Sequence, residues 1–162
     1  HVEVEVPPGV TSENFITLRG KGNVGSQNGP RGDIAVLLEV KEDERFIRDG
    51  EDLYFELPIT FSQATLGAEV EIPTILESMR LTIPAGTQSG EMIRLKGEGL
   101  PQLQGPGQGD QLVRIVVWTP DQLTKEQEEI FEALRLVEEA APEHLSREDR
   151  RSIWSRVKEV FS

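Results

Sequence analysis

Three glycines near the amino terminus have the spacing of a dinucleotide-binding turn. Gly20, Gly22 and Gly25 form G-x-G-x-x-G within the stretch LRGKGNVG. In a dinucleotide-binding fold these glycines lead directly into a helix whose N-terminus faces the pyrophosphate. Here SQNGPRGD and an apolar stretch typical of a strand follow instead. We therefore expect no cofactor, and we expect the glycines to allow positive φ angles at a turn.

Acidic side chains could bind a metal or do acid–base chemistry in two regions. The loop RDGEDL, which begins at Arg48, holds three carboxylates but lacks the alternating ligands and distal glutamate of a calcium loop, so it favours a hairpin or linker turn. Paired carboxylates on strands could also act as a glycosidase-type acid and base. The candidates are Glu3, Glu5, Glu69 and Glu71. Since the chain has 29 acidic residues, such pairs are expected by chance, and we predict neither a catalytic nor a metal site.

The composition excludes several classes of function. There is no cysteine, and the only histidines are His1 and His144, so disulfides, thiolate sites and histidine-rich metal sites are excluded. A formal net charge of −12 argues against nucleic acid as a partner, because binding to phosphates depends on lysine and arginine. No apolar run approaches the roughly 18 residues that a membrane helix needs. We expect a non-enzymatic protein of a reducing compartment, the cytoplasm.

Short apolar stretches between clusters of glycine, proline, asparagine and aspartate predict a mainly β protein. Val2, Val4 and Val6 alternate with glutamates, which indicates a strand with one solvated face, ended by Pro7 and Pro8. Seven further strands are expected at residues 15–18, 34–40, 53–59, 68–72, 79–83, 92–95 and 112–118.

An internal repeat organises these strands. The stretch VPPGVTSENFITLRGKG, residues 6–22, aligns without a gap with IPAGTQSGEMIRLKGEG, residues 83–99, at an offset of 77 residues. The same offset carries Gly32 and Asp33 onto Gly109 and Asp110. We infer two copies of one β unit. Residues 42–78 would be the front half of the second copy, and the front half of the first copy would precede His1.

The pattern changes to helix after Trp118. Thr124 and Gln127 have the spacing of a capping box, and glutamates follow in the first turn. An apolar stripe then comprises Ile130, Phe131, Leu134, Val137 and Ala141, and Pro142 is expected to end the helix. A second helix is expected from Ser146, with Ile153, Trp154, Val157, Val160 and Phe161 on one side. These stripes could pack on the β units or against another chain.

Several segments together resemble the C-terminal region of DnaJ-type co-chaperones. The most specific are FIRDGEDLYFELPITFSQATLGAEVEIPT with IPAGTQSG, supported by VPPGV, LRGKG and TKEQEEIFEAL, and the resemblance covers about residues 2–137. It implies tandem C-terminal-type β-sandwich domains: an incomplete first domain over 1–41, a second over 42–119, and a helical dimerisation tail over 120–162. The J-domain His-Pro-Asp motif, the Gly/Phe-rich linker and the zinc-binding CxxCxGxG repeats of that family do not occur in this sequence.

The resemblance implies that the chain binds unfolded polypeptide by adding it as a strand beside an apolar groove. It also implies that the chain forms a homodimer, and that the whole protein delivers clients to a DnaK-type chaperone. The implied groove comprises Val2, Ala35 and Val36 in the first domain, and the repeat extends it to Val70, Ile72, Met79 and Val113 in the second. The implied dimer contact comprises Ile130, Phe131, Leu134 and Val137.

Two other functions remain open from the sequence. The chain could be a structural dimerisation module that binds no client, in which case the groove residues are ordinary sandwich core. It could also be a β-sandwich hydrolase that uses paired carboxylates, although no spacing singles out such a pair.

Overall fold

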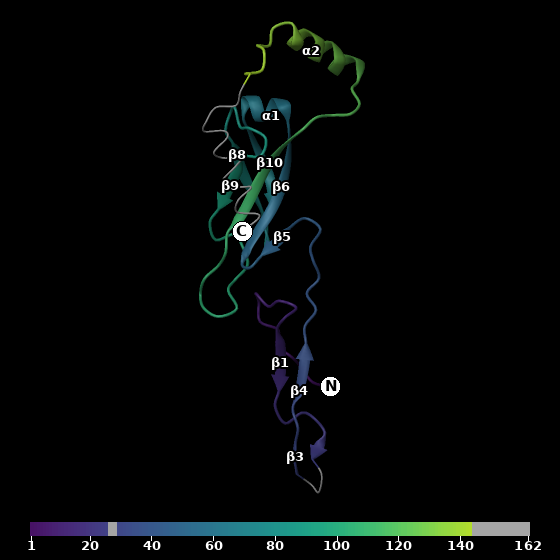
Figure 1. Cartoon of the computed structure of the whole chain (residues 1–162), viewed down its shortest axis with the longest axis vertical. Coiled ribbons are helices and arrows are strands. Elements are labelled where there is room, and N and C mark those ends of the chain that lie inside the picture. Colours follow the sequence, from purple (N-terminus) through teal and green to yellow (C-terminus); the bar gives the residue numbers. More distant parts are fainter. Residues whose placement is uncertain (26–28, 144–162) are drawn as a thin grey trace. The chain divides into compact units, whose positions relative to one another are not determined.

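The computed structural model describes residues 1–25 and 29–143 of the chain. It divides the chain into two compact parts, His1–Val117 and Trp118–Ser162. The first part is built of strands and one short helix, and the described portion of the second part contains one helix (Figure 1). The chain is therefore mainly β, as the sequence predicts. The second helix expected from Ser146, and His144, lie outside the described residues.

The first copy of the repeat, residues 1–41, is a hairpin with an elaborated connection. Strand β1 (Phe15–Leu18) pairs antiparallel with β4 (Ile34–Leu37), and the small hairpin of β2 (Val24–Gly25) and β3 (Gly29–Arg31) lies between them in sequence. The strand expected over residues 2–6 does not form. At the 77-residue offset it corresponds to β8 (Ser78–Ile83), which pairs with β7 (Ala68–Pro73). Among residues 1–25 and 29–143, no strand pairs with residues 2–6 as β7 pairs with β8.

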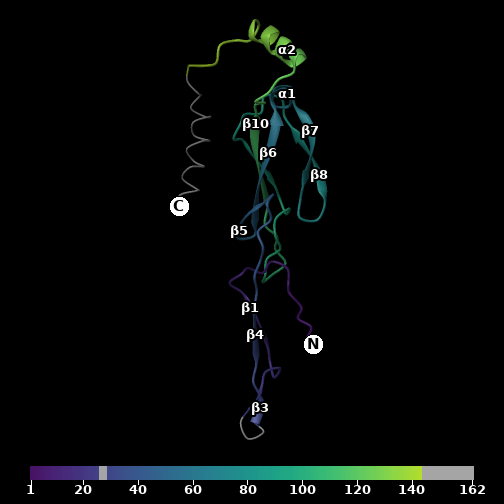
Figure 2. The same ribbon diagram turned by 90° about the vertical axis from the view of Figure 1, so that its right-hand side faces the viewer.

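The second copy, residues 42–117, contains two sheets. One has four strands in the order β5-β6-β10-β9, and the other contains β7 and β8 alone. Figure 2 shows β7 and β8 side by side. The bounds of the remaining strands are β5 (Ile47–Asp49), β6 (Asp52–Thr60), β9 (Met92–Leu95) and β10 (Gln111–Trp118). Asp49 lies opposite Asp52 across the β5–β6 turn, and Gly50 has a φ of 60°, so the acidic loop is the predicted hairpin turn.

Helix α1 (Phe61–Leu66) connects β6 to β7 and was not predicted. Thr60 caps it: the hydroxyl accepts from the N–H of Gln63, and the Gln63 side chain accepts from the N–H of Thr60. This is a capping box, which satisfies two N–H groups that the first turn leaves without helical partners. Gly67 ends the helix with a φ of 80°.

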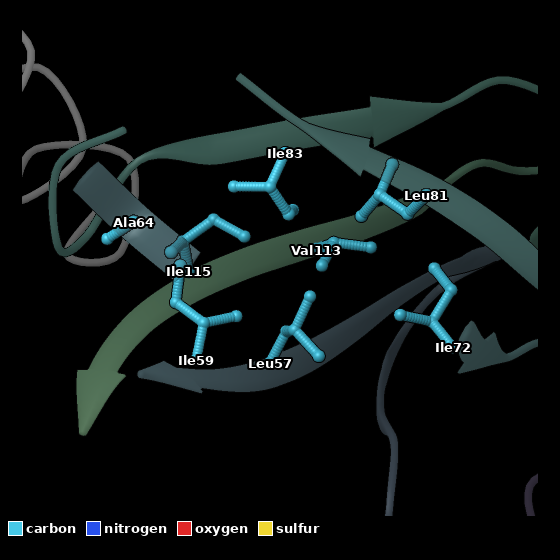
Figure 3. Packing of buried hydrophobic residues seen from close by; sticks show 8 residues of the cluster. All are labelled: Leu57, Ile59, Ala64, Ile72, Leu81, Ile83, Val113 and Ile115. Atoms are coloured by element: carbon cyan, nitrogen blue, oxygen red, sulfur yellow. The ribbon is translucent and has the colours of Figure 1, made fainter. Parts of the chain in front are cut away.

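The hydrophobic core lies between the two sheets of the second copy. It follows from the alternation of apolar and polar residues, because every second side chain of each strand points inward. Figure 3 shows the buried side chains pointing into one cluster. They come from β6, α1, β7, β8 and β10, and they are Leu57, Ile59, Ala64, Ile72, Leu81, Ile83, Val113 and Ile115.

The repeat holds at the level of single hydrogen bonds. Ile16 pairs with Val36 in the first copy, as Ile93 pairs with Val113 in the second. The Gly20 N–H donates to Asp33 Oδ1 at 2.8 Å, and the Gly97 N–H donates to Asp110 Oδ1 at 2.8 Å. Ser12 Oγ accepts from the Val40 N–H at 2.9 Å, and Ser89 Oγ accepts from the Val117 N–H at 3.2 Å. The two copies therefore share one local fold.

Only one glycine of the G-x-G-x-x-G stretch has the positive φ angle that was predicted for all three. Gly20 has a φ of 65° and its equivalent Gly97 a φ of 74°, as expected for a turn. Gly22 is required for close approach instead, since a Cβ there would lie 2.8 Å from the carbonyl of Gly32. At Gly25 a Cβ would lie 3.0 Å from Pro30 O. The expectation of positive φ was therefore wrong for Gly22 and Gly25.

The tail helix α2 (Lys125–Arg135) begins where the sequence predicts and ends earlier. Thr124 and Gln127 form the expected capping box. The helix was predicted to reach Pro142, but its last turn tightens after Arg135, where the Val137 N–H donates to Leu134 O at 3.0 Å. Two glutamates follow at residues 138 and 139. Negative charge is unfavourable at the carboxyl end of a helix dipole, so these glutamates disfavour further helix.

Asp110 connects the β9–β10 hairpin to the β5–β6 hairpin. Its carboxylate accepts from the Gly97 N–H and the Arg94 guanidinium, and its own N–H donates to Asp52 Oδ1 at 2.7 Å. The bond from the Gly97 N–H, and then that from Arg94, hold the pKa of the Asp110 carboxyl below its ordinary value. The folded state therefore favours the ionised carboxylate.

The core predicts a large loss of stability for Ile115→Ala. Ile115 is fully buried between the sheets, so the variant should lower the free energy of unfolding by about 2–5 kcal/mol. Ile47→Ala on β5 is the control, because Ile47 is 70% exposed and its truncation should cost less than about 0.5 kcal/mol. Urea unfolding measures both values. Equal losses in the two variants would contradict the description of the core.

The Asp110 contacts predict a specific pH dependence. A pKa lowered by folding stabilises the protein at pH values above the ordinary pKa, and this stabilisation is lost as the pH falls through the lowered value. Asp110→Asn should therefore be less stable than the unmodified chain at neutral pH, and the difference should shrink below about pH 4. Urea unfolding across this pH range tests it, with Asp121→Asn on the exposed segment before α2 as a charge-matched control. A difference that does not depend on pH would contradict the prediction.

Candidate functional site

The β7–β8 sheet offers open edges for strand addition. It has only two strands in the described chain, so each of them has an edge without a strand partner. Such an edge presents main-chain N–H and C=O groups in a row, and an extended peptide can bond to them whatever its sequence. These edges can therefore bind a peptide through main-chain hydrogen bonds. The side chains of β7 and β8 lie beside the bonding groups and can contact the same peptide.

The structure brings together the four residues predicted for the second copy. Ile72 on β7 lies opposite Met79 on β8, and Val70 lies two residues before Ile72 and so on the same face. Val113 on β10 belongs to the same core cluster. Ile72 and Val113 are fully buried and lie in the cluster drawn in Figure 3, whereas Val70 and Met79 are half-buried. Only Val70 and Met79 therefore have surface that a ligand could contact directly.

The opposite face of this sheet is polar. Glu69 lies opposite Thr82, and Glu71 lies opposite Arg80; all four residues are exposed. This is the solvated face that the alternation predicts. Glu3 and Glu5 lie outside any strand. Within residues 1–25 and 29–143, no group of three or more histidine, cysteine or acidic residues could hold a metal ion.

The groove residues predicted in the first copy are more exposed to solvent than those in the second copy. Ala35 is exposed and Val36 half-buried on β4, and Val2 is 47% exposed on the segment that forms no strand. At the 77-residue offset Val36 corresponds to Val113, which is fully buried. The difference arises because, in the described part of the chain, no strand pairs with the second edge of β4 as β6 pairs with β10, and no sheet covers β4 as β7 and β8 cover β10. The structure does not assemble Val2, Ala35 and Val36 into a closed groove.

Two exposed apolar residues of the first copy were missed by the sequence analysis. Phe15 and Leu37 form a cross-strand pair between β1 and β4, and they are 62% and 81% exposed. Their equivalents in the second copy are Met92 and Arg114. Comparison of the two copies could have found this pair. Strands β4 and β10 otherwise match, but the outward position held by Arg114 on β10 is held by the apolar Leu37 on β4.

The residues predicted for a dimer contact lie on and just beyond α2. Ile130 is 67% exposed and Phe131 41% exposed, while Leu134 is half-buried. Val137 is 78% exposed and follows the end of the helix, so it does not continue the helical stripe as expected. Ile130, Phe131 and Leu134 lie at helical spacing and share one side of α2. No helix in the described chain is long and apolar enough to cross a membrane.

Comparisons with known proteins match the chain to one domain family and to part of several proteins named as chaperones. Residues 1–120 match the family model of the DnaJ C terminal domain. The "Chaperone protein DnaJ" of Salinibacter ruber is 42% identical over 161 residues, which cover 99% of this chain and 42% of that protein. The protein of the same name from Clostridioides difficile is 45% identical over 130 residues, which cover 80% of this chain and 34% of that protein.

The match extends over nearly the whole chain but over less than half of these relatives. The "Chaperone protein DnaJ" of Chlorobium luteolum, 40% identical over 160 residues, shows the same proportions, with 99% of this chain and 42% of that protein covered. The repeat, the two-layered β unit and the capped tail helix agree with the resemblance found in the sequence. The chain belongs to the family of the DnaJ C terminal domain.

Proposed function

We propose that the chain binds unfolded polypeptide segments by β-augmentation and forms a homodimer through α2. The observation that carries the proposal is the two-stranded β7–β8 sheet, whose edges are open and whose core-facing side leaves Val70 and Met79 half-buried. Proteins that share 40–45% identity with the chain are named chaperones, which supports a chaperone role rather than catalysis.

Binding at this edge would combine two interactions. Main-chain hydrogen bonds from β7 or β8 would hold an extended client without regard to its sequence. Alternate apolar side chains of the client would contact Val70 and Met79, while Ile72 and Val113 would form the floor beneath them. In the first copy Val2, Ala35 and Val36 would play the equivalent part. No step of this binding requires a cofactor or a reaction at a side chain.

Dimerisation would follow from the apolar side of α2. Ile130 and Phe131 are large and exposed, and covering them with a second α2 would remove apolar surface from water. A dimer would carry four candidate client sites, so that one long client could bind at more than one of them and gain avidity. In the whole protein, which acts in the cytoplasm, such clients would be passed to a DnaK-type chaperone.

The proposed groove predicts that Val70→Ala with Met79→Ala weakens client binding. The doubly substituted chain should bind a labelled, permanently unfolded peptide roughly tenfold less tightly, because truncation of apolar contact residues commonly costs more than about 1 kcal/mol. Fluorescence anisotropy measures the affinity. The matched control is Glu69→Ala with Thr82→Ala, which truncates a facing pair on the same strands but on the polar side.

Three outcomes would reject this groove. Equal loss of binding in the two variants would assign the effect to the strands in general. Unchanged binding in both would exclude Val70 and Met79 as contacts. No binding by the unmodified chain, with an unfolded client that binds to a longer DnaJ-type protein, would favour a dimerisation module without a client site.

The proposed dimer contact predicts that the Phe131→Glu substitution dissociates the dimer into monomers. A carboxylate at this position would have to lose its hydration against an apolar partner surface, which is strongly unfavourable. Sedimentation velocity should then show a monomer where the unmodified chain is a dimer. Glu132→Gln on the next position of α2 should remain dimeric, and a Phe131→Glu variant that remains dimeric would refute this contact.

A further inference from the structure

The two copies of the β unit are joined by a covalent linker and by one arginine. The linker, residues 38–46, runs from β4 to β5. Arg48, on β5 of the second copy, donates from Nη1 to Val10 O at 2.7 Å and from Nη2 to Gly9 O at 2.8 Å in the first copy. Its Nε donates to Gly50 O at 2.9 Å. The guanidinium of the half-buried Arg48 thus donates hydrogen bonds to main-chain carbonyls of both copies.

The chemistry of these contacts suits arginine and no other side chain. The guanidinium is a rigid plane with five N–H donors, so it can reach three carbonyls in fixed directions at once. Lysine would offer a single ammonium group, which cannot span the same acceptors. Two prolines directly precede the acceptor residues Gly9 and Val10, and their rings fix the local φ angles. The prolines therefore restrict the segment that leads to the two acceptors.

The contact is also tight at the backbone. Gly9 has a φ of 87°, and a Cβ added there would lie 2.3 Å from Pro101 O and 3.2 Å from Leu103 N. Both of these atoms belong to the β9–β10 loop of the second copy. The equivalent Gly86 has a φ of 81°, but a Cβ there would meet nothing within 4 Å. The close approach at Gly9 therefore belongs to the junction between the copies and not to the shared fold.

The linker is itself attached to the second copy. The ring centroids of Phe46 and Phe55 lie 5.7 Å apart, and the Arg45 guanidinium lies 5.1 Å from the centroid of Phe46. Asp43 accepts two hydrogen bonds from the Arg45 guanidinium and one from the Arg45 main-chain N–H, and these bonds hold the pKa of Asp43 at about 2. These contacts order the linker, but a single covalent connection still permits rotation. The Arg48 contact supplies a second attachment between the copies.

We propose that Arg48 is a positioning residue that fixes the orientation of the first β unit relative to the second. With Arg48 in place the two copies move as one body, and without it they rotate about the linker. As a consequence, which rests on the proposed function, Arg48 sets the separation of the two client sites within one chain. That separation determines the effective concentration at which a client bound at one site meets the other.

A distance measurement between the copies tests this role directly. The chain has no cysteine, so Thr17→Cys on β1 and Thr82→Cys on β8 can carry two spin labels, and dilution with unlabelled chain removes signals between subunits. The unmodified background should give one narrow distance distribution. Arg48→Met and Arg48→Lys should both lose this narrow peak. Arg114→Met should keep it, because the ion pair of Arg114 with Glu56 lies within the second copy.

A pair of glycine variants tests the same junction from the other side. Gly9→Ala and Gly86→Ala both place an alanine at a positive φ and share that backbone strain. Only Gly9→Ala drives a Cβ into Pro101, so only Gly9→Ala should broaden the distribution. An unchanged distribution in Arg48→Met, or equal broadening in the two glycine variants, would overturn the proposal.

Client peptides separate this inference from the proposed function. A peptide with one apolar segment should bind Arg48→Met as tightly as the unmodified chain. A peptide with two such segments, joined by a linker matched to the measured distance, should bind Arg48→Met roughly tenfold less tightly. Equal affinity of the longer peptide for both chains would overturn the consequence for binding. If neither peptide binds the unmodified chain, the proposed function fails, while the distance measurement still decides the role of Arg48.

Discussion

The fold of the second copy depends on covering β10. β6 and β9 bond to its two edges, and β7 and β8 pack against one face, so Val113 and Ile115 lose all contact with water. Burial of this kind is the main favourable term in folding. β4 has the same register and the same glycine turns in the first copy, yet Val36 stays half-buried there. The local sequence thus determines that the hairpin forms. Whether the apolar side chains of that hairpin are buried in a core depends on the second sheet that covers it.

Strands and helix starts could be predicted because their signals are local. All seven apolar stretches between residues 15 and 118 form strands, and the capping box at Thr124 begins α2. The signal for α1 was also present, because Thr60 and Gln63 have the same spacing as Thr124 and Gln127. The strand expected at residues 2–6 failed for a different reason. Its alternation is as regular as that of β8, but a strand needs a partner, and a pattern cannot supply one.

The candidate site was only partly predictable. The repeat identified which strands and which face to consider, and the structure gathers Val70, Ile72, Met79 and Val113 into one cluster. Exposure could not be read from the same pattern, because it depends on how the second sheet lies over the first. Ile72 and Met79 are opposite each other, yet one is fully buried and the other half-buried. The role of Arg48 was equally hidden, since its acceptors Gly9 and Val10 lie 38 or more residues away in sequence.

A well-packed core is compatible with binding many different segments. If recognition depended on deep side-chain pockets, Ile72 and Val113 would need to be accessible, and the core would be weakened. Strand addition, the binding mode we propose, would avoid this conflict, because the energy of binding would come mainly from main-chain groups at the edge of β7 or β8, which every client also carries. The side chains then need to supply only shallow apolar contact, which Val70 and Met79 can provide. Such contact is weak at each site, so binding would depend on several sites held at a fixed separation, and this makes the junction at Arg48 as important as the groove.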